Sequence, residues 1–306
     1  MHATTPGPKG YRESSGRSAV GIVGWVIYAQ VMTADLTATP ILRDVLLVSG
    51  ADAFRYLQTQ LTQDVVALEP GDSTWSFILT PKSEIEALVR VTRHGDVAVL
   101  DVAVGRGPAL RGRLDGLLFR MEVVFEEATW QGVAWRGDGA REVEVDAPVV
   151  AALPWDSVDA ADVLGPEPGV PAQMPSLSME ELEALRIEAG WPAEPEIDGL
   201  ATPAMTGVVE DTVSFTKGCY TGQEFVARVQ SRGATPPRRL VRVLFTAGEQ
   251  VAPGAEFTID GELVGTITSS VPGAGVGLGY LKRSIVAPVD AVCGGVTVWL
   301  HEVVAE

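Results

Sequence analysis

The sequence has few of the residues that hold metals or form disulfides. Its 306 residues include only two cysteines, Cys219 and Cys293, which do not form a CxxC pair. The three histidines, His2, His94 and His301, show neither metal-ligand nor catalytic-triad spacing. This pattern predicts no zinc or iron-sulfur centre and no disulfide framework, and two lone thiols suit a reducing cytoplasm.

Basic residues are also scarce. The chain has 23 Lys plus Arg against 40 Asp plus Glu, a formal net charge of -17 at pH 7. Such a charge repels the phosphate backbone of DNA and RNA. We therefore expect no direct nucleic-acid partner.

A long hydrophobic run is missing as well. The apolar stretch at 19–29 contains Gly21 and Gly24, and it is shorter than the about 20 residues that span a bilayer. We expect no membrane segment, and we interpret residues 1–31 as a disordered N-terminal extension with Met32 as the functional start.

The patterns that follow predict an α+β fold. Residues 41–48 are typical of a buried strand, and Ser49 to Asp52 supply a turn and a helix cap. Residues 75–104 contain three β-rich runs broken at 80–82 and 94–96, which predicts an antiparallel meander. A helix over 109–118 and a strand over 121–128 complete this unit.

The second half of the chain begins with an acidic, Pro- and Gly-rich stretch over 132–175, which we interpret as a variable connection. Ser178 and Glu181 then form a capping-box pattern for a helix that ends at Gly190. After residue 240, short β runs separated by Gly and Pro predict a small β-barrel or sandwich. The expected domains are thus 32–239 and a C-terminal β-barrel over 240–306.

The most informative stretch is KGCYTGQEFVAR, residues 217–228. It places a cation, a thiol, a phenol, an amide, a carboxylate and a guanidinium within one turn-helix length, and Gly218 and Gly222 allow close backbone approach. Lys217 and a helix start at Gln223 would both favour a thiolate at Cys219.

KGCYTGQE followed by AR closely resembles the signature of the YgfZ family, within the superfamily of the glycine cleavage T-protein, an aminomethyltransferase. Residues 46–65, 185–190 (LRIEAG), 202–219, 260–270 and 277–281 resemble other parts of that family. The resemblance covers the chain from Asp35 to its end.

The resemblance implies a T-protein-like ring of two interleaved α+β units and a C-terminal β-barrel around a central channel. The ligand it implies is tetrahydrofolate or a one-carbon derivative, bound with its pterin inward. Glu188 of LRIEAG would read the pterin edge, since a carboxylate accepts two N–H donors. The alternative for Glu188 is a solvated helix charge paired with Arg186.

Within the signature, the resemblance makes Lys217 and Cys219 a functional motif, and it implies folate contacts from Tyr220, Gln223, Glu224 and Arg228. Each has a structural alternative. Lys217 could be an exposed cation and Cys219 a buried small hydrophobe. The other four could be a core tyrosine, helix caps and an i, i+4 ion pair.

One position departs from the aminomethyltransferase. The place of its catalytic aspartate falls on Ala87 or Leu88, which cannot transfer a proton. Glu84 and Glu86 lie close by in the sequence.

Two functions therefore remain. The first is a folate-dependent factor in iron-sulfur protein maintenance or assembly, indirectly linked to tRNA modification, with iron-sulfur proteins or their assembly factors as partners. The second is a folate-dependent aminomethyltransferase or other one-carbon transferase.

The signature gives a first prediction. Cys219→Ser should keep the melting temperature nearly unchanged yet fail to restore iron-sulfur enzyme activity in a deletion strain, and Lys217→Ala should also fail. Cys293→Ser, the control, should restore activity. Full rescue by the Cys219 variant would show that its thiol carries no necessary chemistry.

Overall fold

The computed structural model describes residues 35–303 except 170, 172, 198 and 233–234. The expected N-terminal extension, 1–31, lies outside the described residues. No helix in the described part of the chain has the length and apolar character needed to cross a membrane.

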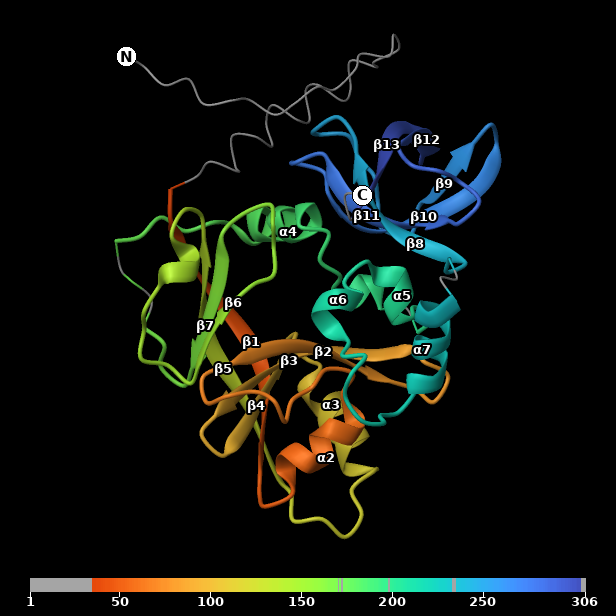
Figure 1. The fold of residues 1–306 in the computed structure, drawn as a ribbon. Coiled ribbons are helices and arrows are strands. Elements are labelled where there is room, and N and C mark those ends of the chain that lie inside the picture. Colours follow the sequence, from red (N-terminus) through yellow and green to blue (C-terminus); the bar gives the residue numbers. More distant parts are fainter. Residues whose placement is uncertain (1–34, 170, 172, 198, 233–234, 304–306) are drawn as a thin grey trace, which may run out of the picture.

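Strands from residues 37–165 form one seven-stranded antiparallel sheet with the order β2-β3-β4-β1-β5-β7-β6 (Figure 1). Its strands are β1 (Thr37–Ser49), β2 (Ser73–Leu79), β3 (Ile85–His94), β4 (Val97–Val102), β5 (Val124–Arg136), β6 (Val149–Ala152) and β7 (Ala160–Gly165). β1 and β5 pair along 13 residues and form the spine of the sheet. The helical elements are α2 (Ala53–Gln60), α3 (Gly107–Asp115), η1 (Ala140–Glu142), α4 (Met179–Glu188), η2 (Glu194–Glu196), α5 (Pro203–Thr206), α6 (Val209–Thr212) and α7 (Gln223–Arg232).

The sheet is strongly curved, as one buried ion pair shows. Arg90 of β3 donates from Nη1 to Asp162 Oδ2 of β7 over 3.0 Å, although four strand-to-strand steps separate these strands. In a flat sheet those steps would span about 19 Å. The sheet must therefore curl into a half-barrel whose concave face brings β3 and β7 together.

The two faces of the sheet bury different cores. α2 and α3 cover one face, where Leu57, Leu100 and Leu114 are fully buried. On the other face, a core built around Trp155, Leu185 and Trp191 joins the sheet to α4 and the first barrel strands. Figure 1 shows α2 and α3 on the side of the sheet away from the barrel.

The C-terminal strands form a closed six-stranded barrel with the order β10-β11-β8-β13-β12-β9. They are β8 (Arg238–Leu244), β9 (Glu256–Ile259), β10 (Glu262–Val271), β11 (Val276–Lys282), β12 (Val289–Cys293) and β13 (Val296–Glu302). Cys293 is fully buried in the barrel core beside Phe257 and Val298. The predicted α+β fold with a C-terminal barrel is confirmed.

Local predictions had mixed outcomes. The Ser178–Glu181 capping box is present, whereas Asp52 makes no side-chain cap. The Asp52 carboxylate instead accepts the backbone N–H of Glu122 and pairs with Arg55. The interpretation of 132–175 as a mere connection was wrong, because it contains the end of β5 and all of β6 and β7.

The buried ion pairs give a second prediction. Asp162→Asn should destabilise the protein by about 3 kcal/mol or more, because it leaves Arg90 and Arg136 short of a buried counter-charge. Asp115→Asn, which breaks the more exposed pair with Arg111, should change the free energy of unfolding by about 0.5 kcal/mol or less. Urea unfolding of both variants would measure this. Equal effects would show that the network does not hold the half-barrel closed.

Candidate functional site

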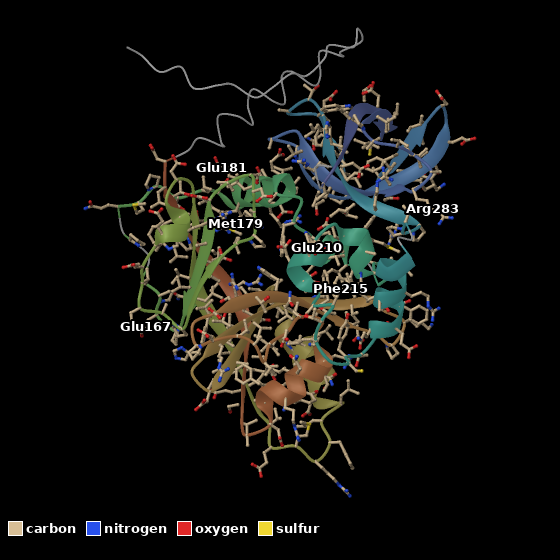
Figure 2. The ribbon with its side chains drawn as sticks, viewed as in Figure 1. Glu167, Met179, Glu181, Glu210, Phe215 and Arg283 are labelled. Carbon is tan, nitrogen blue, oxygen red and sulfur yellow. The ribbon has the colours of Figure 1, made fainter. Side chains whose placement is uncertain are left out.

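A cavity of about 280 Å³ lies on the concave face of the sheet, between β1, β3, the strand ends of β5–β7 and helix α4. Three tryptophans, Trp75, Trp155 and Trp191, line it together with apolar side chains such as Leu88 and Leu182. Met179, which is labelled in Figure 2, lies in the first turn of α4. It also lines the cavity and is 66% exposed, which puts it at the mouth.

The tryptophans give the cavity flat aromatic walls. The rings of Trp75 and Trp191 meet at 61° with centroids 5.3 Å apart. Arg90 lies 5.3 Å from the Trp75 ring and Arg136 lies 4.8 Å from the Trp155 ring. The buried indole N–H groups of Trp75 and Trp155 have no acceptor among the described residues. Such donors are costly to leave unpaired, so these two indoles are lining residues with unused hydrogen-bonding capacity.

Every carboxylate among the described lining residues is paired with an arginine. Asp162 accepts from Arg90 and Arg136. Although burial alone would raise the pKa of Asp162, these two guanidinium groups lower it below its ordinary value. Glu183 pairs with Arg186, and Glu194 with Arg106. No lining carboxylate is thus left as an uncommitted base.

The position expected for a catalytic aspartate carries no acid on the cavity side. Leu88 lines the cavity, whereas Ala87 packs against the core on the opposite face of the sheet. Glu86 pairs with Arg113 of α3 and does not line the cavity. Glu84 precedes β3 in the hairpin turn, where its carboxylate accepts the hydroxyl of Thr80 at 3.2 Å.

The structure gives Lys217 a tethering position. Its side chain is buried, and Nζ donates to the carbonyl oxygens of Leu61 (2.8 Å) and Gln63 (2.7 Å). Burial lowers the pKa of Lys217 to about 8, while Asp64 acts in the opposite direction. Lys217 therefore is not an exposed cation, and its removal leaves two carbonyls in the loop after α2 without a donor.

The thiol of Cys219 is exposed, so the residue is not a buried hydrophobe. Its neighbour Tyr220 belongs to the core, and burial raises the pKa of Tyr220 to about 12. In the signature, the buried side chains of Lys217 and Tyr220 thus lie on either side of the exposed thiol of Cys219 in the sequence.

The turn after Tyr220 packs closely on the β2–β3 hairpin. Gly222 adopts φ +82°, and a Cβ there would lie 2.7 Å from the carbonyl oxygen of Thr80. Ser83 donates its hydroxyl to the Gly222 carbonyl at 2.6 Å. Only glycine fits this close approach.

The predicted ligand residues of α7 lie away from the cavity. α7 starts at Gln223, as predicted. The Gln223 side chain accepts the backbone N–H of Tyr220 at 3.3 Å, as a cap does. Glu224 is exposed, and the Arg228 guanidinium lies 5.2 Å from the Phe225 ring. None of Tyr220, Gln223, Glu224 and Arg228 is among the residues lining the cavity.

Glu188 points away from the cavity, toward the barrel. It is buried, and its Oε1 lies 3.8 Å from Arg242 Nη1 of β8. Its Oε2 has no partner among the described residues. Burial raises the pKa of Glu188 to about 7, and Arg242 offsets only part of this effect because the pair is long. The alternative of an Arg186 partner is not what the structure shows, since Arg186 pairs with Glu183 and Glu196.

The cavity residues that sequence reasoning missed are mainly its tryptophans and arginines. Trp191 directly follows the LRIEAG segment, and Trp75 is the third residue of β2, so their positions in or beside recognised segments were a usable signal. The glycine of that segment has a packing reason. Gly190 adopts φ +67°, and a Cβ there would lie 2.1 Å from Val303.

Comparisons with known proteins agree with this architecture. The structure resembles the glycine cleavage system aminomethyltransferase T of Bartonella henselae with a TM-score of 0.73, covering 90% of this chain and 87% of that one at 17% identity. The two chains thus share one fold. No family model matches the sequence.

Two relatives with similar sequences indicate the family within this fold. An uncharacterized protein of Haemophilus influenzae is 30% identical over 233 residues, 73% of this chain and 80% of the relative. The tRNA-modifying protein YgfZ of Edwardsiella ictaluri is 29% identical over 240 residues, 68% of this chain and 70% of the relative. The chain belongs to the YgfZ family.

The position of Glu188 gives a third prediction. Because its folded-state pKa of about 7 lies above the value of 4.5 for a free side chain, its contribution to stability is full below pH 4.5 and is lost as the pH rises to 7. Glu188→Gln removes this titration. Its stability relative to the wild type should rise by about 3 kcal/mol between pH 4 and pH 8.

Urea unfolding across this pH range would test the effect, with the exposed Glu180→Gln on the same helix as control. If the free energies of unfolding of the wild type and of Glu188→Gln differ by the same amount at every pH, Glu188 is not a buried, uncompensated carboxyl group.

Proposed function

We propose that this chain binds a reduced folate in the tryptophan-lined cavity and supports the maintenance of iron-sulfur proteins in the cytoplasm, and through them tRNA modification. The observation that carries the proposal is the cavity itself. It joins aromatic walls and two unpartnered indole N–H groups with a lining in which each carboxylate is engaged by an arginine.

The cavity residues fit a pterin. Its flat, conjugated ring matches the walls formed by Trp75, Trp155 and Trp191, since aromatic rings gain from stacked and edge contacts. The free N–H groups of Trp75 and Trp155 can donate to the ring's oxygen and nitrogen acceptors. Glu183 and Arg186, at the α4 side, offer a polar edge. When bound, a reduced folate would supply a one-carbon carrier.

The alternative of a one-carbon transferase has less support. General acid-base chemistry needs a titratable group within hydrogen-bond reach of the reacting atoms. Leu88 occupies the cavity face of β3, and Glu86 pairs with Arg113 outside this cavity. The absence of an uncommitted acid or base among the described lining residues therefore favours a folate-binding protein without aminomethyl transfer.

Cys219 supplies the second part of the proposed function. Its exposed thiol lies two residues from the tether of Lys217 and one from the core residue Tyr220, so the backbone beneath it is fixed. An exposed thiol on a fixed backbone suits transient contact with a partner protein better than cluster storage, which needs several thiolates. Iron-sulfur proteins or their assembly factors are the partners we propose.

The fourth prediction tests the ligand site. Trp155→Phe keeps the aromatic wall but removes one unpartnered N–H donor, so it should weaken tetrahydrofolate binding about tenfold, the equivalent of one hydrogen bond. Isothermal titration calorimetry under anaerobic conditions would measure this. Trp299→Phe, in the barrel strand β13, is the matched control and should bind like the wild type.

The variant Glu188→Ala tests whether the pterin binds in the tryptophan-lined cavity or at Glu188, the site expected from the sequence. If the cavity holds the pterin, affinity stays within about twofold of the wild type. The opposite outcome is that Glu188→Ala loses roughly 1 to 3 kcal/mol of tetrahydrofolate binding energy, the cost of unpaired buried donors, while Trp155→Phe binds normally. This result would place the pterin at Glu188. If the folded wild-type protein does not bind tetrahydrofolate, the folate proposal is wrong.

A further inference from the structure

The charges of the C-terminal barrel are distributed unevenly. Residues 238–302 contain six carboxylates, which are spread over several strands and loops, and five basic side chains. All five basic residues lie on β8 or at the end of β11, two strands that pair with each other: Arg238, Arg239, Arg242, Lys282 and Arg283. In a chain with a formal net charge of -17, this is a local concentration of positive charge.

Two of these basic residues are engaged by carboxylates inside the molecule. Arg239 forms an ion pair with Glu302 of β13, and Arg242 lies 3.8 Å from the buried Glu188. These contacts join β8 to β13 and to α4, so both arginines have a structural role. The other three basic residues lie together at one edge of the barrel.

Arg238, Lys282 and Arg283 form what we call the barrel patch. Arg238 and Lys282 are directly opposite each other in the ladder between β8 and β11. The backbone N–H of Arg283 donates to the Pro237 carbonyl at 3.1 Å, which places Arg283 beside the start of β8. Lys282 donates to the Leu263 carbonyl at 2.6 Å. Lys282 and Arg283 are both exposed, and neither forms an ion pair with another described residue. Arg283 lies at the outer edge of the barrel (Figure 2).

The barrel patch has a cost in stability. Like charges on directly opposite residues of an antiparallel pair repel each other, as Arg238 and Lys282 do here. The Tyr280 ring, whose centroid lies 4.2 Å from the Arg238 guanidinium carbon, offsets part of this repulsion through a cation–π contact. The exposed cations Lys282 and Arg283 therefore keep a positive field that an acidic partner can neutralise.

An apolar side chain is held next to these cations. Val286, in the loop between β11 and β12, is 80% exposed and lies three positions after Arg283. Its neighbours Ile285 and Ala287 pack against the barrel core, and Arg239 donates to the Ile285 carbonyl at 2.9 Å. Because the residues on both sides of Val286 are anchored, its side chain is presented to solvent at a fixed place.

We propose that the barrel patch and Val286 bind a short acidic segment of a partner protein. Carboxylates of this segment lie on Lys282 and Arg283, and an apolar side chain packs against Val286. Arginine is enriched in protein interfaces, and complementary charge speeds the encounter and fixes the register of the partner. The proposal depends neither on the folate cavity nor on the thiol of Cys219.

The charge of the rest of the barrel favours an acidic peptide over a nucleic acid. Surface charges are screened beyond about 8 Å at physiological ionic strength, so a short peptide segment interacts with the patch and with little else. A nucleic acid carries a negative charge at every nucleotide and extends beyond the patch. There it meets the carboxylates of Glu256, Asp260 and Glu262 on β9, on β10 and in the turn between them.

Fluorescence anisotropy with the full-length protein tests the proposal. The probe is a labelled peptide of aspartate and glutamate with a central leucine. We expect saturable binding that weakens at least tenfold when NaCl is raised from about 50 to 300 mM, because salt screens the patch. Arg283→Glu should weaken binding at least tenfold. Lys82→Glu is the matched control, because Lys82 is exposed in the turn between β2 and β3, outside the barrel. It should bind within about twofold of the wild type.

Lys282→Glu separates a binding role from a structural one. It places a carboxylate opposite Arg238 and removes the repulsion between like charges. The melting temperature should therefore be unchanged or higher, while binding of the acidic peptide falls at least tenfold. Val286→Ser should weaken the leucine peptide about fivefold, because apolar contact is lost, and should leave a serine-centred peptide unchanged.

Three results would overturn the proposal: no peptide binding by the folded wild-type protein, equal weakening by Lys82→Glu, or unchanged binding by both Arg283→Glu and Lys282→Glu. A single-stranded oligonucleotide of the same charge as the peptide distinguishes the class of partner. Weaker binding of the oligonucleotide supports a protein partner. If the oligonucleotide binds more tightly than the peptide, the patch serves a nucleic acid and the proposal is wrong.

Discussion

The curvature of the sheet depends on a network of buried charges that spans five strands. Asp101 of β4 pairs with Arg43 of β1 and Arg90 of β3, and Asp162 of β7 pairs with Arg90 and with Arg136 of β5. Buried ion pairs contribute little net stability relative to well-packed apolar groups, but a broken one is costly. The network therefore specifies a shape, because it is complete only when the sheet is curled.

That shape creates the concave face on which the tryptophans lie. The guanidinium groups that close the sheet also lie against the rings of Trp75 and Trp155. A cation near an aromatic face is an attractive contact that also restrains the ring. The same arginines thus curve the sheet and orient the cavity walls.

Much of the fold could be predicted from local sequence. The meander, the Ser178 capping box, the helix start at Gln223 and the C-terminal barrel all depend on short-range patterns. β7 was missed because its buried strand AADVLG lies within a stretch rich in acidic residues, Pro and Gly. The composition of the whole stretch hid six consecutive buried residues.

The site was harder to predict because it depends on curvature and on which face of an element a residue occupies. Arg90 and Asp162 are 72 positions apart, and nothing local marks them as partners. Leu88 and Ala87 are adjacent on β3, yet one faces the cavity and the other the opposite core, since side chains alternate along a strand. On α4, Glu188 and the cavity residue Arg186 also point to different sides of the helix.

The tether of Lys217 has a consequence for how the chain is made. Lys217 holds carbonyls of Leu61 and Gln63 from up to 156 positions away, and Thr62 likewise donates to the Thr212 carbonyl at 2.6 Å. During synthesis the loop after α2 leaves the ribosome long before the segment that secures it. Its final packing must wait until the signature has been translated, whereas the barrel strands that emerge last pair only with one another. The signature is thus the point at which the early and late parts of the nascent chain are joined.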